Sequence, residues 1–311
     1  MVWAGIDVAE RQVDFHVLQG ETGPRGRRPR RARGLAELAA ELSGYGVGRV
    51  VLEATGGYER AVWEALEAGG LEVALVQPRR IRQYARAAGV ESKTDPLDAR
   101  MAARYGAAIQ PAATPLPSKR QSLYRELLGQ LNWLVGERAR LRNRRLRTHE
   151  DAVAASCERT AAALSEEIER LETAVQAALE ALPETAAQAD LLRSAPGVGT
   201  KTAWALTAYL PELGSLSGKQ AAALAGLAPR ARDSGAYRGR RTIGGGRAPL
   251  RRALYLAAWT AVRCDPKLRS FYHRLLAAGK AKKLALIAVA RRLLTTLNAM
   301  ARDQSAWHPL A

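Results

Sequence analysis

Four acidic side chains in the first third of the chain have the types and spacing of a metal site. Asp95 and Asp98 lie in the stretch KTDPLDAR, and residues at this spacing share one face of a helix. Asp7 lies inside the apolar segment VWAGIDVA, and Glu53 ends the apolar segment VVLE. Mg²⁺ prefers hard oxygen ligands, and converging carboxylates suit two such ions about 3.5–4 Å apart, the arrangement used in phosphodiester chemistry.

Each of these acids also has a purely structural explanation. Thr94 could cap a helix, Pro96 suits a first helical turn, and early acids oppose the helix dipole. Asp7 could accept backbone hydrogen bonds at a turn, and Glu53 could pair with an arginine. The placement of the acids alone leaves the two interpretations equally open.

The apolar periodicity predicts the elements that position these acids. Strands are expected at residues 2–9, 12–19, 48–55 and 71–78, and helices at 35–42, 58–70, 81–89 and around the KTDPLDAR stretch. The basic segment 23–34 is expected to form a turn with an irregular third strand. A hairpin followed by alternating strands and helices predicts an α/β domain with a mixed sheet over residues 1–112. Glu53 then stands at the carboxyl end of a strand, where open sheets place their sites.

The remainder of the chain reads as helical. Pro111, Pro115 and Pro117 mark a boundary, and leucines recur at helical spacing from 118 to 182 without a proline. This pattern predicts two long amphipathic helices that form an antiparallel or intermolecular coiled coil over 118–182. A mainly helical C-terminal domain is expected over 190–302.

The composition favours a polyanionic partner. Lys and Arg number 48 against 30 Asp and Glu, for a formal net charge of +18, which makes nucleic acid the leading candidate. An arginine-rich genome would enrich arginine without a function, but would not leave the acids so outnumbered. The stretch ERARLRNRRLRTHE holds six arginines, of which Arg142, Arg144 and Arg145 are predicted to contact phosphates rather than only to form a solvated face.

Cysteine usage and hydropathy bear on the compartment. Cys157 and Cys264 lie far apart in no motif, which fits a reducing compartment and argues against a thiolate metal site. No signal peptide is recognisable, and no apolar stretch is expected to be long enough to cross a membrane. We therefore expect a cytoplasmic protein.

Two further segments could contact phosphates. PGVG, between two expected helices, matches a helix-hairpin-helix turn, so Gly197, Gly199 and Lys201 are predicted to contact a nucleic-acid backbone; an ordinary turn between helices also favours glycine. A segment rich in arginine and glycine follows. Its predicted phosphate contacts are Arg238, Arg240, Arg241, Gly245 and Arg247.

Ser234 lies within this second segment, directly before a glycine. A serine hydroxyl needs activation to act as a nucleophile, and no histidine is near in sequence. The residues alone therefore favour a turn serine. The scattered histidines are interpreted as structural or surface residues.

Longer motifs resemble those of one family across nearly the whole chain. They are GIDVAERQVDFHVL, VVLEATGGYER, VALVQPRRIRQYARAAGVESKTDPLDARMAARYG, PGVGTKTA and GLAPRARDSGAYRGRRTIGGGRAPLRRALYLAA. In this order they resemble the IS110-family transposases. The resemblance implies a RuvC-like domain of the RNase H fold and a C-terminal transposase domain. It places the family's D-E-D-D metal and catalytic set on Asp7, Glu53, Asp95 and Asp98.

The same resemblance implies a role for Ser234. The family has a Ser-Gly motif whose serine is the catalytic nucleophile, with Tyr237 a lower-ranked rival here. The loop after Ile243 lacks a lysine found in some relatives, which weakens only its predicted phosphate contacts. Family members act as dimers that assemble into tetramers, and a bridge RNA from the element's non-coding ends pairs with donor and target DNA.

The resulting prediction is a Mg²⁺-dependent DNA recombinase of a mobile element, guided by such an RNA. It would cut and rejoin DNA through a serine-linked intermediate, at a composite site between domains or subunits. Rival predictions are an invertase of the same fold, a junction-resolving nuclease that needs only the carboxylates, and a nucleic-acid-binding protein without enzymatic activity.

Overall fold

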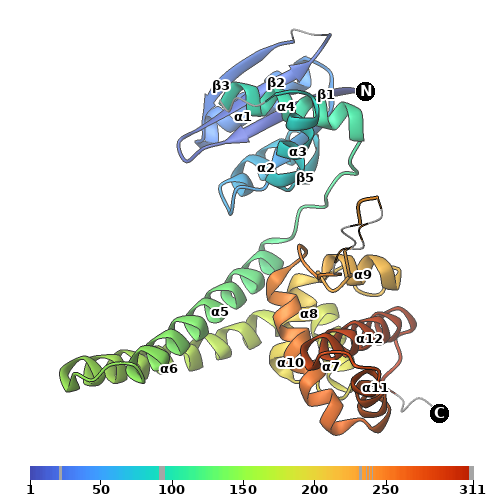
Figure 1. The fold of residues 1–311 in the computed structure, drawn as a ribbon. Coiled ribbons are helices and arrows are strands. Elements are labelled where there is room, and N and C mark those ends of the chain that lie inside the picture. Colours follow the sequence, from blue (N-terminus) through green and yellow to red (C-terminus); the bar gives the residue numbers. More distant parts are fainter. Residues whose placement is uncertain are drawn as a thin grey trace. The chain divides into compact units, whose positions relative to one another are not determined.

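The computed structural model describes residues 1–20, 23–90, 95–230, 233–235, 237, 239 and 241–307, without the side chains of 95–97. The chain divides into two compact units, Met1–Pro117 and Ser118–Ala311 (Figure 1). The boundary lies within the predicted proline-marked segment. Each unit has its own core and is described separately.

The first unit is an α/β layer structure, as the sequence predicted. Its strands are β1 (Val2–Val8), β2 (Gln12–Leu18), β3 (Arg25–Pro29), β4 (Val47–Glu53) and β5 (Glu72–Val76). Its helices are α1 (Ala32–Gly44), α2 (Glu59–Ala68), α3 (Pro78–Ala87) and α4 (Asp95–Ile109). The expected strands and helices are confirmed to within a few residues, and the irregular strand is a regular edge strand, β3. The predicted cap at Thr94 lies outside the described residues.

The five strands form one mixed sheet in the order β3-β2-β1-β4-β5. β1 pairs antiparallel with β2 and parallel with β4, and the register runs through Asp7↔Asp14 and Ile6↔Leu52. Alternation along β1 sends Ala4 and Ile6 into a core with α1 and α2. Trp3 points to the opposite face, where it packs with residues of α3 and α4.

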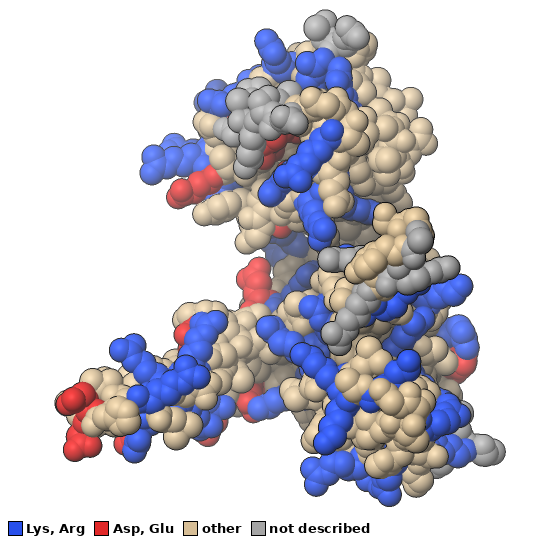
Figure 2. Space-filling model, viewed as in Figure 1, with Lys and Arg blue, Asp and Glu red and all other residues tan. Residues whose placement is uncertain are grey.

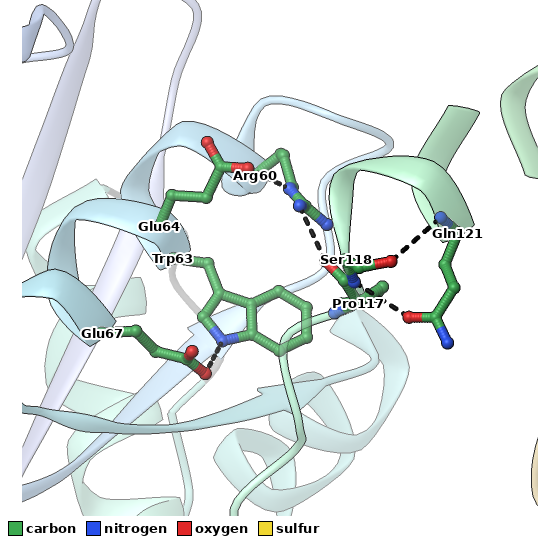
Figure 3. A network of polar contacts seen from close by, with 7 residues as sticks. All are labelled: Arg60, Trp63, Glu64, Glu67, Pro117, Ser118 and Gln121. Carbon is green, nitrogen blue, oxygen red and sulfur yellow. Dashed lines mark hydrogen bonds and ion pairs between the residues drawn. The ribbon is translucent and has the colours of Figure 1, made fainter. Parts of the chain in front are cut away.

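Polar contacts order the end of the first unit and the start of the next helix (Figure 3). Arg60 of α2 donates to the Pro117 carbonyl over 2.9 Å and also to Glu64. Ser118 and Gln121 form a reciprocal capping box that starts the following helix. Pro117 and Ser118 are thus each bonded within their own unit.

The second unit is helical throughout its regular structure. Its helices are α5 (Lys119–Arg145), α6 (Asp151–Glu180), α7 (Pro183–Arg193), α8 (Thr200–Tyr209), α9 (Gly218–Leu224), α10 (Ala248–Cys264), α11 (Pro266–Ala277) and α12 (Lys282–Asp303). α5 and α6 form a long antiparallel hairpin, which confirms the predicted pair of amphipathic helices (Figure 1). One hydrophobic core runs from the base of this hairpin, at Leu128 and Val175, to α12 at Leu293. The division into segments 118–182 and 190–302 stays a prediction.

Helix α12 corrects one expectation from the sequence. Among the described helices it is long and apolar enough, by length and composition, to cross a membrane, so the prediction that no segment reaches this length is wrong. More than half of its apolar window is buried inside the unit, and Leu286, Leu293 and Leu297 are at most 2% exposed. α12 packs on α10, α9 and α7, which is the position of a core helix.

Candidate functional site

Two of the predicted carboxylates lie side by side at the edge of the sheet that is formed by the carboxyl ends of the parallel strands β1 and β4. The register of β1 and β4 ends at the pair Ile6↔Leu52, so Asp7 and Glu53 are the next residues of two adjacent parallel strands. Alternation places both on the face that carries Trp3 and Val51, which is the face covered by α4. Both residues are half-buried.

Gly5 brings α4 close to this edge. A Cβ at Gly5 would come within 2.2 Å of the Ala99 carbonyl oxygen and 2.3 Å of the Ala103 nitrogen. Further along α4, Gly106 lies directly against Trp3. The helix therefore runs antiparallel to β1, with its first turn toward the Asp7 end. Only glycine at position 5 permits this separation.

Asp98 occupies that first turn and is half-buried. Asp95 is the first residue of α4, but its side chain lies outside the described residues. Among the residues that are described, no three His, Cys, Asp or Glu side chains lie close enough to hold a metal ion. The structure thus brings Asp7 and Glu53 to one sheet edge and directs the helix with Asp95 and Asp98 toward it.

The donor chemistry at this edge fits a hard divalent cation. The oxygen donors come from carboxylates, and neither cysteine is in this unit. Magnesium and calcium prefer such oxygen sets, and magnesium commonly takes only one or two protein carboxylates plus substrate phosphates. Asp7, Glu53, Asp95 and Asp98 stay the predicted ligands of such an ion.

The structure adds a fifth carboxylate that sequence reasoning missed. Asp14 pairs directly with Asp7 across β1 and β2, so both side chains lie on the α4 face. Asp14 is 6% exposed and accepts a hydrogen bond from Arg27 Nε over 3.0 Å. Like charges directly opposite each other destabilise a sheet, and Arg27 compensates the charge of Asp14. An acid inside an apolar strand, the signal that marked Asp7, would also have found Asp14.

His16 is a second buried polar group on this face. It pairs with Gly5 on one side and with Arg25 on the other, and its Nε2 has no hydrogen-bond partner among the described residues. Burial lowers the pKa of His16, and the charges of nearby arginines lower it further: Arg100, Arg25 and Arg104. His16 is therefore a neutral, structural residue at neutral pH, as the sequence interpretation held.

Ser234 stands at the tip of a short antiparallel ribbon in the second unit. Isolated bridges join Arg230 to Thr242 and Ser234 to Tyr237. The Ser234 and Tyr237 backbones exchange hydrogen bonds of 3.0 and 2.9 Å, and Asp233 pairs with Arg241 across the ribbon at 2.8 Å. Both Ser234 and Tyr237 are exposed. The predicted contacts Arg238 and Arg240 lie outside the described residues.

The glycine loop after this ribbon is packed against the end of α9. A Cβ at Gly246 would come within 2.4 Å of the Gly226 nitrogen, and a Cβ at Gly245 within 2.2 Å of the Arg230 guanidinium. Arg247 donates to both carboxylate oxygens of Glu212, at 2.7 and 2.6 Å. Arg247 thus makes a structural ion pair, and the Arg230 guanidinium lies beside the loop.

The PGVG turn joins α7 to α8 and lies against α10. A Cβ at Gly197 would come within 2.3 Å of the Ala257 carbonyl oxygen, and Gly197 has a φ of +82°. Gly199, in contrast, has open space around its Cβ position and caps α8 without a side-chain hydrogen bond. Gly197 therefore serves packing, whereas Gly199 leaves the start of α8 accessible to a phosphate.

Basic side chains cover much of the second unit in the view of Figure 2, over the α5–α6 hairpin and the helices beyond it. Arg142, Arg144 and Arg145 form the basic last turn of α5, and all are exposed. Arg145 pairs with Glu158 at 2.5 Å, and Lys201 pairs with Glu172 at 2.5 Å. Both pairs are solvent-exposed, so they are weak and can exchange for phosphate contacts.

Comparisons with known proteins converge on one family. Residues 4–153 match the family DEDD_Tnp_IS110, described as Transposase, and residues 189–273 match a family described as Transposase IS116/IS110/IS902 family. The chain is 29% identical to the pilin gene-inverting protein of Moraxella lacunata, over 97% of this chain and 96% of the relative. It is 36% identical to the insertion element IS110 uncharacterized 43.6 kDa protein of Streptomyces coelicolor, over 49% of this chain and 37% of the relative.

Proposed function

Because the chain belongs to the IS110 family of transposases, and is therefore an enzyme that acts on DNA, we propose that it cuts and rejoins DNA through a covalent bond to Ser234. The observation that carries this proposal is the exposed Ser234 in the bridge at the tip of the ribbon, next to the Asp233–Arg241 ion pair. The first unit contributes the carboxylates. Its strand order, with an antiparallel hairpin beside parallel strands, supports an RNase H-like fold.

The proposed chemistry is a phosphoryl transfer in two steps. Ser234 Oγ attacks a phosphodiester, so an Oγ–P bond forms while the bond from phosphorus to one deoxyribose oxygen breaks, and the serine proton ends on that leaving oxygen. A hydroxyl of the second DNA then attacks the phosphoserine, which rejoins the strand and returns the proton to Ser234. Arginines such as Arg230 stabilise the charge that develops on the phosphate.

The carboxylates have a separate task in this proposal. Asp7, Glu53, Asp95 and Asp98 would hold divalent cations, taken as Mg²⁺, and a bound ion supplies charge stabilisation at phosphate oxygens. Asp14, held by Arg27, keeps the Asp7 end of the sheet polar and ordered. Gly5 keeps α4 close enough for its first turn to face the same edge.

The test of the serine step uses a plasmid that carries the chain's native flanking DNA and a target. Ser234→Ala is expected to lower recombination at least about a thousandfold, as loss of a nucleophile does. It should also abolish a protein–DNA adduct that survives denaturation. Ser270→Ala, an exposed serine on α11, is the matched control and should retain both. Tyr237→Phe should retain activity.

Two outcomes would redirect the assignment. If Ser234→Ala still cuts branched DNA while Asp7→Asn does not, the chain is a nuclease that hydrolyses with its carboxylates alone. If Asp7→Asn and Ser234→Ala both recombine normally, the enzymatic assignment of these sites is wrong. Binding of Mn²⁺ to the purified protein should weaken in Asp7→Asn whatever the activity.

A second candidate function is site-specific DNA inversion. The similarity to a pilin gene-inverting protein over 97% of this chain favours it. Two substrates distinguish inversion from transposition. One carries two sites in opposite orientation on one plasmid, and the other carries the sites on separate plasmids. An inverting enzyme acts only on the first substrate, whereas a transposase also joins the second.

A guide RNA belongs to the same proposal, together with assembly into dimers and tetramers. Its support is the charge of +18 and the exposed arginines of the α5–α6 hairpin. Expression with the native flanking DNA, purification and sequencing of the bound RNA tests it. One discrete RNA from the flanks supports guidance, and mixed cellular RNA or none contradicts it.

A further inference from the structure

An exposed stripe on α10 combines apolar and cationic side chains. Leu256 and Trp259 are 67% and 53% exposed, although most large apolar side chains of this unit lie in its core. Arg252 and Arg263 are exposed at either end of the pair. At helical spacings of three and four residues, these side chains form one continuous face.

One residue of the stripe, Leu256, lies beside the PGVG turn. A shallow, open depression of about 420 Å³ is lined by Gly197, Gly199 and Thr202 of the turn region and by Leu256 and Thr260 of α10. The close approach of Gly197 to the Ala257 carbonyl fixes the turn on this part of α10. Leu256 therefore joins the stripe to this depression, whereas Trp259 and the two arginines lie outside its lining.

The charges on α10 indicate what this surface accepts. The helix contains three arginines and no Asp or Glu. Arginines that flank an apolar pair suit a ligand that alternates phosphates with flat apolar groups, and nucleic acid has this pattern. A symmetric contact with a second copy would bring the same cations together, which is unfavourable.

Tryptophan has the appropriate chemistry for a base. Its large ring can stack on any nucleobase, because every base has a π-face, and such stacking tolerates sequence. Leu256, one turn away, extends the apolar surface under the adjoining sugar. A base within a continuous duplex is stacked on its neighbours, so this surface requires an unpaired base.

We propose that Leu256 and Trp259 form a stacking platform for an unpaired nucleobase, flanked by phosphate contacts at Arg252 and Arg263. The platform deepens the proposed function and rests on it, because strand exchange exposes unpaired bases next to the cut. The phosphate contact at the turn belongs to the site described above. The base platform on α10 is the new element.

Binding of labelled single-stranded DNA, single-stranded RNA of the same sequence, and duplex DNA tests the platform in the full chain. Trp259→Ala is expected to weaken single-strand binding roughly tenfold, and Trp259→Phe to retain most of the affinity because it keeps a ring. The slope of affinity against salt should stay unchanged in Trp259→Ala and decrease in the double variant Arg252→Gln/Arg263→Gln. Leu284→Ala, which removes a 46% exposed leucine from α12, is the control and should bind normally.

Photocrosslinking gives a readout that does not depend on affinity. A strand that carries 5-bromouracil at an unpaired position should crosslink to the peptide that contains Trp259. The single-stranded DNA and RNA probes identify the source of the base. If Trp259→Ala loses affinity only for RNA, the base belongs to a guide strand; if it loses affinity only for DNA, the base belongs to a substrate strand. Thermal unfolding should be unchanged, because Trp259 is on the surface.

Several results would overturn the platform. If Trp259→Ala binds every probe as tightly as the wild type does, the platform is rejected. A change of sedimentation in Trp259→Ala with unchanged binding assigns the surface to a second copy. If the wild type binds no nucleic acid, the proposed function fails as well. If the wild type recombines DNA and Trp259→Ala has the same nucleic-acid affinity and the same recombination activity, only the platform is rejected.

Discussion

Single residues on the α4 face of the sheet decide how the carboxylate edge is built. Asp7 and Asp14 are direct cross-strand neighbours, and Arg27 compensates the second charge at 3.0 Å. His16 fills the neighbouring position beside Gly5 and is 4% exposed. A neutral imidazole fits there, whereas an imidazolium would add charge to a cluster of arginines.

The stability of the first unit should therefore depend on pH through His16. Its folded pKa lies below the ordinary value of 6.5, so the unfolded chain binds a proton more readily. Stability is expected to be full above pH 6.5 and to fall below it by up to about 1.4 kcal/mol per pH unit. Urea unfolding of the wild type and His16→Gln at several pH values measures this.

His16→Gln should flatten the pH dependence of the unfolding free energy below pH 6.5. His273→Gln, which changes an exposed histidine of α11, should leave this dependence as in the wild type. An equal slope in His16→Gln and the wild type would show that other groups cause the loss. The charged groups that face His16 from β3 and α4 are arginines, Arg25, Arg100 and Arg104, and they stay charged across this range.

At the scale of elements, glycines set which helices and turns approach closely. Gly5 allows α4 to pack closely on β1, and Gly197 allows the PGVG turn to pack closely on α10. The sequence predicted phosphate contact for both glycines of PGVG, because residue type alone does not distinguish a packed glycine from an exposed one. The structure separates them, since Gly197 faces a backbone carbonyl and Gly199 faces open space.

Three glycine substitutions should separate these roles. Gly197→Ala is expected to destabilise the second unit by several kcal/mol, roughly 3, because of its positive φ and the contact with Ala257. Gly199→Ala should change stability little. Gly129→Ala, inside α5 with open space at its Cβ, should stabilise by about 0.5–1 kcal/mol.

Thermal and urea unfolding of the three variants provide the comparison. Nucleic-acid affinity separates them further, because Gly199→Ala should weaken phosphate contact at the α8 start while the fold persists. Equal stability losses for Gly197→Ala and Gly199→Ala would contradict the different packing of the two positions.

At the scale of the molecule, each unit has the core needed to fold alone. The first buries both faces of its sheet, and the second has one core from α5 to α12. Arg60 and the Ser118 capping box order the residues on either side of the boundary (Figure 3). The basic surface of the second unit suits nucleic acid (Figure 2).

Separate expression of residues 1–117 and 118–311 should therefore yield two folded fragments. Each is expected to unfold cooperatively, with the second retaining nucleic-acid binding. Circular dichroism, calorimetry and binding of a single strand measure these properties. An aggregated or unfolded first fragment, with the second unaffected, would show that the sheet depends on residues beyond Pro117.

The sequence by itself determined the elements and the residue types that they carry. Alternation and helical spacing are local properties, so they located the strands with Asp7 and Glu53, the helix with Asp98 and the α5–α6 pair. The family resemblance supplied the roles proposed for the carboxylates and for Ser234, which spacing alone left open.

Tertiary structure decided which of these residues are neighbours. Strand register places Asp14 opposite Asp7, helix packing turns the long apolar α12 into a core element, and Arg247 is used in an ion pair with Glu212. The exposure of Trp259 and the position of Leu256 beside the PGVG turn also depend on packing. Contacts between distant segments arise only when complementary faces bury each other, and no local pattern in the sequence encodes that choice.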